Sequence, residues 1–225
     1  MMKKKFLSVT CLMSAALIFS SANSGASGNG HKITYQIIIT NLTPGQPIAP
    51  PMVTTHHEGI SFFKAGDAPT PELAALAEAG DGNPMAAKLS NTPGFRDAQV
   101  GTSGIGPGET GTIMIHAHSR KDHLSLGAML GNTNDAFIAL RDVALPQGRH
   151  TITYFANAYD AGSETNDESC STVPGPACGG AGLSPEDEGE GFVHIHNGIH
   201  GIGGLDAALY DWRNPGAQVV IMRMQ

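Results

Sequence analysis

The segment T-I-T-Y-F-A-N-A-Y-D-A-G-S-E, residues 151–164, decides the expected fold because an apolar run ends in an acidic turn. Residues 151–156 have the β-branched and aromatic side chains that are typical of a strand. Asp160 follows, and Gly162 allows the chain to turn sharply away from the strand. The segment therefore predicts a strand whose end presents a carboxylate in a loop.

A second acidic loop lies about 25 residues upstream, where Asn132-Thr133-Asn134-Asp135 opens the apolar run 136–140. If the two strands are neighbours, Asp135 and Asp160 reach one end of a sheet. Paired loop carboxylates suit calcium, which takes six to eight oxygen ligands and accepts backbone and amide carbonyls as well as carboxylates. Glu164, Asn134 or backbone carbonyls would complete the shell. The alternative is that Asp and Asn occur here only because they favour turns.

The N-terminus has the pattern of a secretory signal peptide. Lysines at 3–5 precede an apolar run, 6–19, that is too short to span a bilayer, and small residues follow it. We expect a signal peptide over 1–22, with cleavage as late as 26, and a secreted protein, extracellular or periplasmic. No later stretch is apolar enough to predict a membrane span.

After a flexible leader at 23–30, residues 31–225 are expected to form one domain. The chain has 13 Lys and Arg against 20 Asp and Glu, so loss of the three lysines with the leader would leave 10 basic residues. An acidic surface argues against nucleic acid and anionic lipid as partners. Two cysteines remain, Cys170 and Cys178, and in an oxidising compartment they are expected to pair and to staple a local loop.

Short alternating runs with few helices predict a mainly β fold, an antiparallel β-sandwich with one or two short helices. Residues 70–80 have the cap, first-position proline and terminal glycine of a helix, and a second short helix is expected at 83–89. Residues 91–111 are expected to be rich in loops, and 112–118 and 124–130 to form a hairpin. Residues 165–190 should form a long irregular segment. The other expected strands are 31–40, 192–196 and 218–224.

The histidines offer a different site. His116 and His118 alternate on one strand, as do His194 and His196, and His200 follows in a glycine-rich loop. Rings at i and i+2 on a strand point to the same side, and three or four of them would suit zinc or copper. A zinc or copper binding protein or a metalloenzyme is therefore the alternative to a calcium-binding module. The alternative to a metal site is that these rings only form hydrogen bonds with neighbouring residues.

The two acidic motifs together resemble the spondin N-terminal domain family. The resemblance is carried by Thr133-Asn134-Asp135-Ala136-Phe137-Ile138, by Tyr159-Asp160-Ala161-Gly162-Ser163-Glu164, by His123-Leu124-Ser125-Leu126 with Met129, and by the helix 71–80. It extends from about Ile33 to about Ile221. The family is also found in bacterial secreted proteins.

This resemblance implies a β-sandwich related to C2 domains, with one calcium held by an aspartate in each loop, here Asp135 and Asp160. In animal members a glutamate on the preceding strand supplies a third carboxylate. The run 112–118 contains no acidic residue, and His116 to His118 stand in that region. The site would then be completed by Glu164, carbonyls and water, or it would include His116 or His118 and favour a softer ion.

Animal members of the family act in adhesion and cell-surface recognition. We accordingly expect a non-enzymatic binding or adhesion module with an unknown cell-surface or extracellular ligand. No catalytic residue is assigned, and the sequence gives no oligomeric state.

Overall fold

The computed structural model describes residues 32–187 and 189–225, and the chain from 32 onward folds as one compact unit. The expected signal peptide, the leader and the first residue of the expected domain lie outside the described residues. Within those ranges, no helix is both long and apolar enough to cross a bilayer.

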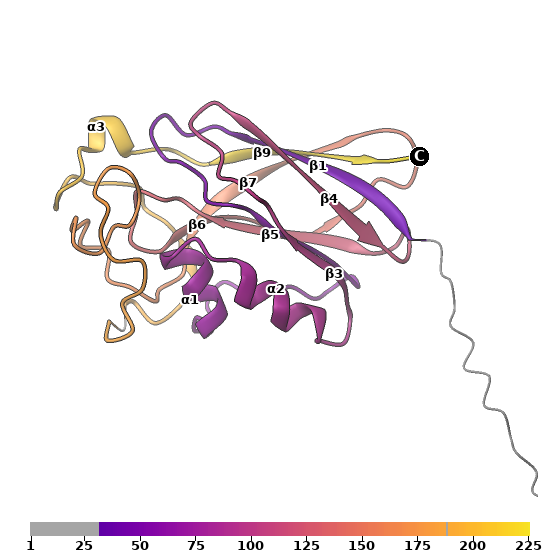
Figure 1. Cartoon of the computed structure of the whole chain (residues 1–225), viewed down its shortest axis with the longest axis horizontal. Coiled ribbons are helices and arrows are strands. Elements are labelled where there is room, and N and C mark those ends of the chain that lie inside the picture. The colour runs from indigo at the N-terminus through magenta and orange to yellow at the C-terminus, as the bar shows by residue number, and fades with distance from the viewer. Residues whose placement is uncertain (1–31, 188) are drawn as a thin grey trace, which may run out of the picture. The chain divides into compact units, whose positions relative to one another are not determined.

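The described chain is mainly antiparallel β with three short helices, which confirms the predicted fold class. Every strand ladder is antiparallel, and the sheet has the order β3-β2-β5-β6-β7-β9-β1-β4, with β8 beside β7 (Figure 1). The finer prediction of a two-layer sandwich stays a prediction. The strands are β1 (Ile33–Asn41), β2 (Met52–His56), β3 (Phe95–Val100), β4 (Thr110–Ala117), β5 (His123–Met129), β6 (Ala136–Ala144), β7 (Ile152–Asp160), β8 (His194–Ile195) and β9 (Ala217–Arg223).

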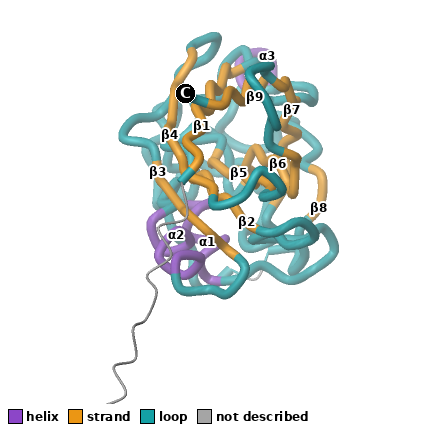
Figure 2. Tube along the Cα trace, turned by 90° about the vertical axis from the view of Figure 1, so that its right-hand side faces the viewer, coloured by secondary structure: helices purple, strands orange, loops and turns teal. Residues whose placement is uncertain are grey.

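Strand β7 joins the two halves of the sheet. Its first half, Ile152–Ala156, pairs with β9, whereas its second half, Asn157–Asp160, pairs with β6. Figure 2 shows β4, β1, β9 and β7 along one side of the molecule and β3, β2, β5 and β6 along the other. The two edge strands of this order, β3 and β4, also contact each other, because the Asp97 carboxylate on β3 accepts a hydrogen bond from the His116 amide on β4 at 2.8 Å.

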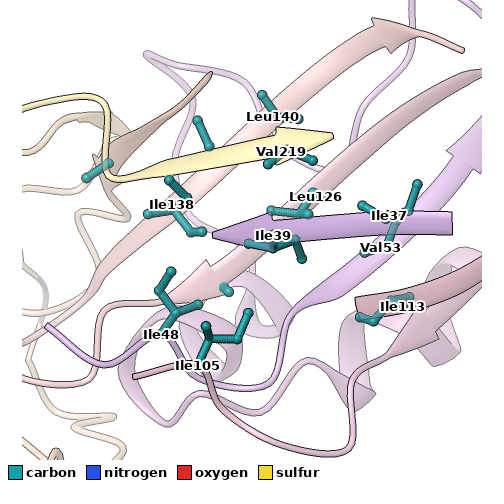
Figure 3. Close-up of a cluster of buried hydrophobic side chains, with 14 of the residues drawn as sticks. Ile37, Ile39, Ile48, Val53, Ile105, Ile113, Leu126, Ile138, Leu140 and Val219 are labelled. Atoms are coloured by element: carbon teal, nitrogen blue, oxygen red, sulfur yellow. The ribbon is translucent and has the colours of Figure 1, made fainter. Parts of the chain in front are cut away.

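The main core lies where these strands face one another. Branched aliphatic side chains from both halves of the sheet meet there, as the close-up in Figure 3 shows. Ile37 and Ile39 come from β1, Val219 from β9, and Ile138 and Leu140 from β6, which places alternate residues of each strand on the same face. This alternation is the pattern that predicts the strands at 31–40 and 112–118.

Helix α1 (Pro71–Glu78) covers the opposite face of β5 and β6, and α2 (Asn83–Ser90) covers β2 and β3; a second apolar cluster forms beneath the two helices. The expected cap of α1 is confirmed, because the Thr70 hydroxyl accepts a hydrogen bond from the Leu73 amide at 3.3 Å and Pro71 is the first residue. Leu73 and Leu76 pack against Phe137 and Ala139 of β6.

Several expected elements are corrected. The runs 112–118 and 124–130 are both strands but not a hairpin, because β4 pairs with β1 while β5 lies between β2 and β6. Residues 91–111 contain strand β3, and the expected strand 192–196 shortens to the two residues of β8. A third helix, α3 (Ala207–Tyr210), was not predicted.

A core substitution measures how far the sheet depends on this packing. Ile138 is 0 % exposed, so Ile138→Ala leaves a cavity and should lower the free energy of unfolding by about 2–5 kcal/mol. Ile195 is 46 % exposed, and Ile195→Ala is the matched control, expected to cost under about 1 kcal/mol. Urea denaturation of both variants compares them, and equal losses would contradict the placement of the core.

Candidate functional site

The two predicted aspartates lie side by side at one end of the sheet. Asp135 immediately precedes β6 and Asp160 is the last residue of β7, where Ala136 and Asp160 are directly paired. The Ala161 amide donates to the Asp135 carbonyl at 3.2 Å and continues the ladder by one step. Both side chains are buried. The structure therefore brings the two carboxylates together, as the strand pattern predicted.

One oxygen of Asp135 has no partner among the described residues. Oδ2 accepts hydrogen bonds from the Ser163 amide at 2.8 Å and the Glu164 amide at 3.2 Å. Oδ1 is buried and accepts none. Because a buried carboxylate oxygen without a donor is costly, this atom requires a physical explanation, such as a bound ion, water or proton.

Asp160 is better supplied with donors. Its Oδ1 accepts from the Gly162 amide at 2.7 Å, and its Oδ2 accepts from the Asn166 side-chain amide at 2.5 Å. The rings of His194 and His196 lie farther off, with nitrogens 3.7 Å and 4.0 Å from the carboxylate oxygens. Asp160 is thus held in place but has a weak cationic environment.

Electrostatics make the pair unfavourable when both groups are ionised. Burial raises the pKa of Asp135, and the nearby negative charge of Asp160 raises it further. Burial also raises the pKa of Asp160, against the lowering effects of the Asn166 hydrogen bond and of His194. The negative charge of Glu190 acts on both groups in the same direction. A divalent cation between these carboxylates would relieve both the repulsion and the missing hydrogen bond.

The turn after Asp160 depends on glycine, as the sequence predicted. Gly162 has φ +69°, and a Cβ there would lie 2.3 Å from the Phe192 carbonyl oxygen. The Gly191 amide donates to the Gly162 carbonyl at 2.8 Å. The turn is consequently clamped between the ends of β7 and the segment that leads into β8, with no room for a side chain.

Glu164 contributes its backbone, not its carboxylate, to the aspartate pair. Its Oε1 accepts a hydrogen bond from the Ser184 hydroxyl at 2.5 Å, and the Ser184 amide donates to Glu78 of α1. Burial raises the pKa of Glu164 to about 7, with a further increase from the charge of Glu78. Glu164 as a side-chain ligand stays a prediction, because its carboxylate is engaged with Ser184 in this structure.

The irregular segment predicted for 165–190 is present, since the described residues between β7 and β8 form neither helix nor strand. Cys170 and Cys178 form the predicted disulfide. Asn134 holds the segment in place, because its side chain accepts from the Glu168 amide and donates to Asp167 and Thr172. Asn134 is thus engaged with this segment and not with Asp135.

Glu168 ties the same segment to the glycine-rich loop 198–204. Its carboxylate accepts hydrogen bonds from three successive amides, those of His200, Gly201 and Ile202, at 2.6–3.0 Å. Figure 1 places the irregular segment and α3 at the same end of the molecule, opposite the end where the chain finishes after β9.

His116 and His118 do not reach this site. His116 pairs with Thr34 at the start of β1. The next residue, Tyr35, pairs with Arg223 at the end of β9, and β9 in turn pairs there with Ile152 at the start of β7. Asp160 is eight residues farther along β7, which is about 25 Å at the usual strand rise. The predictions that either ring completes the aspartate site, or joins a site with His194, are corrected by this topology.

The other three candidate histidines do share one space. His194, His196 and His200 line a cavity of about 260 Å³ together with Asp160 and Glu190. Both nitrogens of His196 are in use, however, because Nδ1 accepts from the Gly198 amide at 2.9 Å and Nε2 lies 3.1 Å from Asn166 Oδ1. Burial lowers the pKa of His196 to about 4, so the ring is neutral at neutral pH.

Two residues of this site were missed from the sequence. Asn166 bridges Asp160, Glu190 and His196 through one side-chain amide. Glu190 is the further carboxylate whose charge acts on both aspartates. Both residues lie in the irregular segment, which has no periodicity to indicate where a side chain points.

The arrangement provides two buried carboxylates. Within the described part of the chain, Asp135 has an oxygen without a partner, and Asp160 lines the cavity that contains the three histidines. Across the described ranges, no three His, Cys, Asp or Glu side chains already form a metal-binding cluster. Comparison with known proteins adds no assignment, because no protein-family model and no curated protein matches this chain.

The aspartate pair predicts an unusual pH dependence in the presence of a chelator. Because the folded pKa values lie above the unfolded value of about 3.9, the folded state binds more protons than the unfolded state, and its stability falls as pH rises. The free energy of unfolding of the wild type minus that of Asp135→Asn should therefore decrease between about pH 4 and about pH 8.

The neutral His196 has the opposite effect, since a lowered histidine pKa adds stability as pH rises toward about 6.5. That effect is common to both proteins and cancels in the difference. Urea denaturation at several pH values measures this difference in the free energy of unfolding. A difference that stays constant or increases with pH would show that burial does not raise the pKa of Asp135.

Proposed function

We propose that this chain is a secreted, spondin-like binding or adhesion module in which Asp135 and Asp160 hold a divalent cation, calcium in the first instance. The family assignment rests on the two acidic motifs and on a mainly antiparallel β fold of the expected kind. The ligand would be a cell-surface or extracellular molecule, and the role of the ion is structural. No enzymatic activity is proposed.

The observation that carries the proposal is the unpartnered Oδ1 of Asp135 beside a second buried carboxylate. Two buried negative charges that repel each other are stable only with a counter-charge or a proton. Calcium supplies two positive charges and accepts carboxylate and carbonyl oxygens in flexible geometry. The two carboxylates are hard oxygen ligands, which suit this ion better than a softer one.

Asp135 and Asp160 would be the principal ligands. Glu190 is a further carboxylate whose charge acts on both of them, and it lines the same cavity as Asp160. With two or three carboxylates the affinity would be modest, about 10⁻⁴ to 10⁻³ M, as in extracellular calcium modules.

The ion would also order the irregular segment. The turn at Ser163 and Glu164 is attached to Asp135 through two backbone amides, and Asn166 is attached to Asp160. Neutralising the two aspartates therefore stabilises the first residues of the segment, and Asn134 and the disulfide fix the residues that follow. A binding surface formed by this end of the molecule would depend on the ion for its shape.

Zinc or copper on the histidines is the alternative proposal. The observation in its favour is the shared cavity of His194, His196 and His200. Against it, His196 would have to give up a hydrogen bond before it could bind a metal.

Calcium should raise the melting temperature of the wild type, and Asp160→Asn should remove most of that increase. The physical reason is that an ion bound only by the folded state stabilises it by mass action, about 2.7 kcal/mol at a hundredfold excess over the dissociation constant. In chelator, the variant should melt at or above the wild type, because the substitution also removes the repulsion between the two carboxylates. Differential scanning calorimetry in calcium and in chelator gives both comparisons.

Asp67→Asn is the control, because Asp67 is an exposed carboxylate paired with Lys64 outside the site. It should keep the full calcium response. If Asp160→Asn lowered the melting temperature equally in calcium and in chelator, the ion would have no part in its effect. Stoichiometric zinc or copper in protein purified without a tag, lost in His194→Ala, would instead support the alternative.

A further inference from the structure

A second cavity, of about 370 Å³, lies on the helix-covered face of the sheet and is not part of the aspartate site. The loop 59–70, the first turn of α1 and the end of β6 surround it. Its apolar wall comes from Phe62, Phe63, Leu73 and Val193, and its basic side chains are Lys64 and Arg141. This volume is in the range of pockets that bind small organic molecules.

Arg141 is the unusual residue of this cavity. Phe137 and Ala139 on the same strand are buried under α1. Because alternate residues of a strand point to the same face, Arg141 lies on that face too, just beyond the part that α1 covers. Lys64 is paired with Asp67 at 3.7 Å. Within residues 32–187 and 189–225, by contrast, Arg141 has neither an ion pair nor a side-chain hydrogen bond.

A β-bulge fixes the position of Arg141. Leu126 pairs with Leu140 and Leu124 with Val143, so Arg141 and Asp142 both lie opposite the single residue Ser125. Asp142 has φ +54°, a conformation that is costly for a residue other than glycine. Bulges and strained residues of this kind recur beside functional sites, where they redirect a side chain.

Buried polar contacts hold the bulge. The Ser125 hydroxyl accepts from the Asp142 amide at 3.0 Å and lies 2.8 Å from Nε2 of the buried His56. The Asp142 carboxylate accepts from the Gly59 amide at 3.0 Å and lies 2.8 Å from His123 Nδ1. The strained strand is thus tied to the loop that forms the other wall of the cavity. These contacts fix the bulge beside Arg141, whose side chain is exposed.

From this geometry we infer that the cavity binds a small organic acid, a carboxylate on an apolar or aromatic body. The Arg141 guanidinium presents parallel N–H donors that match a carboxylate. The side chains of Phe62, Phe63 and Val193 provide an apolar surface for the rest of the molecule. Asp67 also lines the cavity, and its charge disfavours a doubly charged group such as phosphate. This site is independent of the proposed cation.

The test uses phenylacetate as the probe and phenylacetamide as its neutral counterpart of nearly equal shape. Isothermal titration of the full chain, in calcium and again in chelator, should show saturable binding of phenylacetate. Arg141→Gln should weaken that binding by at least about tenfold, because a charge-assisted bidentate contact is lost. Phenylacetamide should bind the wild type at least about tenfold more weakly than the acid, for the same reason.

Arg149→Gln is the matched control, since it makes the same change of charge at an exposed arginine in the turn between β6 and β7, outside the cavity. It should bind phenylacetate as the wild type does. Equal thermal melting of the two variants shows that both remain folded. No saturable binding of phenylacetate, equal binding of the acid and the amide, or equal affinity in wild type and Arg141→Gln would each overturn the inference.

Discussion

Two carboxylates buried next to each other at the ends of β6 and β7 are the constraint on which this end of the molecule depends. Asp135 and Asp160 are brought together by the antiparallel pairing of two strands, and the hydrogen bonds around them use backbone amides of the turn that follows. Such a pair is stable only when its charge is compensated. The shape of the turn, the irregular segment and the cavity beside them is coupled to how that compensation is made.

The rest of the fold positions this pair. Strand β7 belongs to both halves of the sheet. The main core on one face of the sheet and the helix-covered cluster on the other therefore both fix the position of Asp160 at the end of this strand. Next to the two aspartates, Phe137 and Tyr159 stack on each other and both contact Phe63, with ring centroids 5.1–5.8 Å apart. Phe63 also lines the cavity at Arg141. One aromatic cluster therefore adjoins both candidate sites.

Local signals in the sequence predicted much of this structure. Alternation predicted β1 and β4, apolar runs predicted β7 and β9, the cap and proline predicted α1, and the acidic turns predicted that Asp135 and Asp160 converge. These features depend on neighbouring residues, which is why a single sequence contains them.

The errors concern contacts between distant parts of the chain. The partner of β4 is β1, about eighty residues away, and local alternation does not indicate a strand partner. Strand β3 was missed because it is a half-exposed terminal strand without alternation. The direction of the Glu164 side chain and the role of Asn166 are set by an irregular segment folding back on the sheet, for which no periodic pattern exists.

The most direct test of the account is a crystal structure of the protein grown with calcium, with anomalous scattering used to locate the ion. The account predicts one peak between Asp135 and Asp160, about 2.3–2.6 Å from Oδ1 of Asp135, the usual calcium–oxygen distance. Absence of that peak at saturating calcium, with Asp135 Oδ1 bonded to a water molecule or to a protonated Asp160, would contradict it.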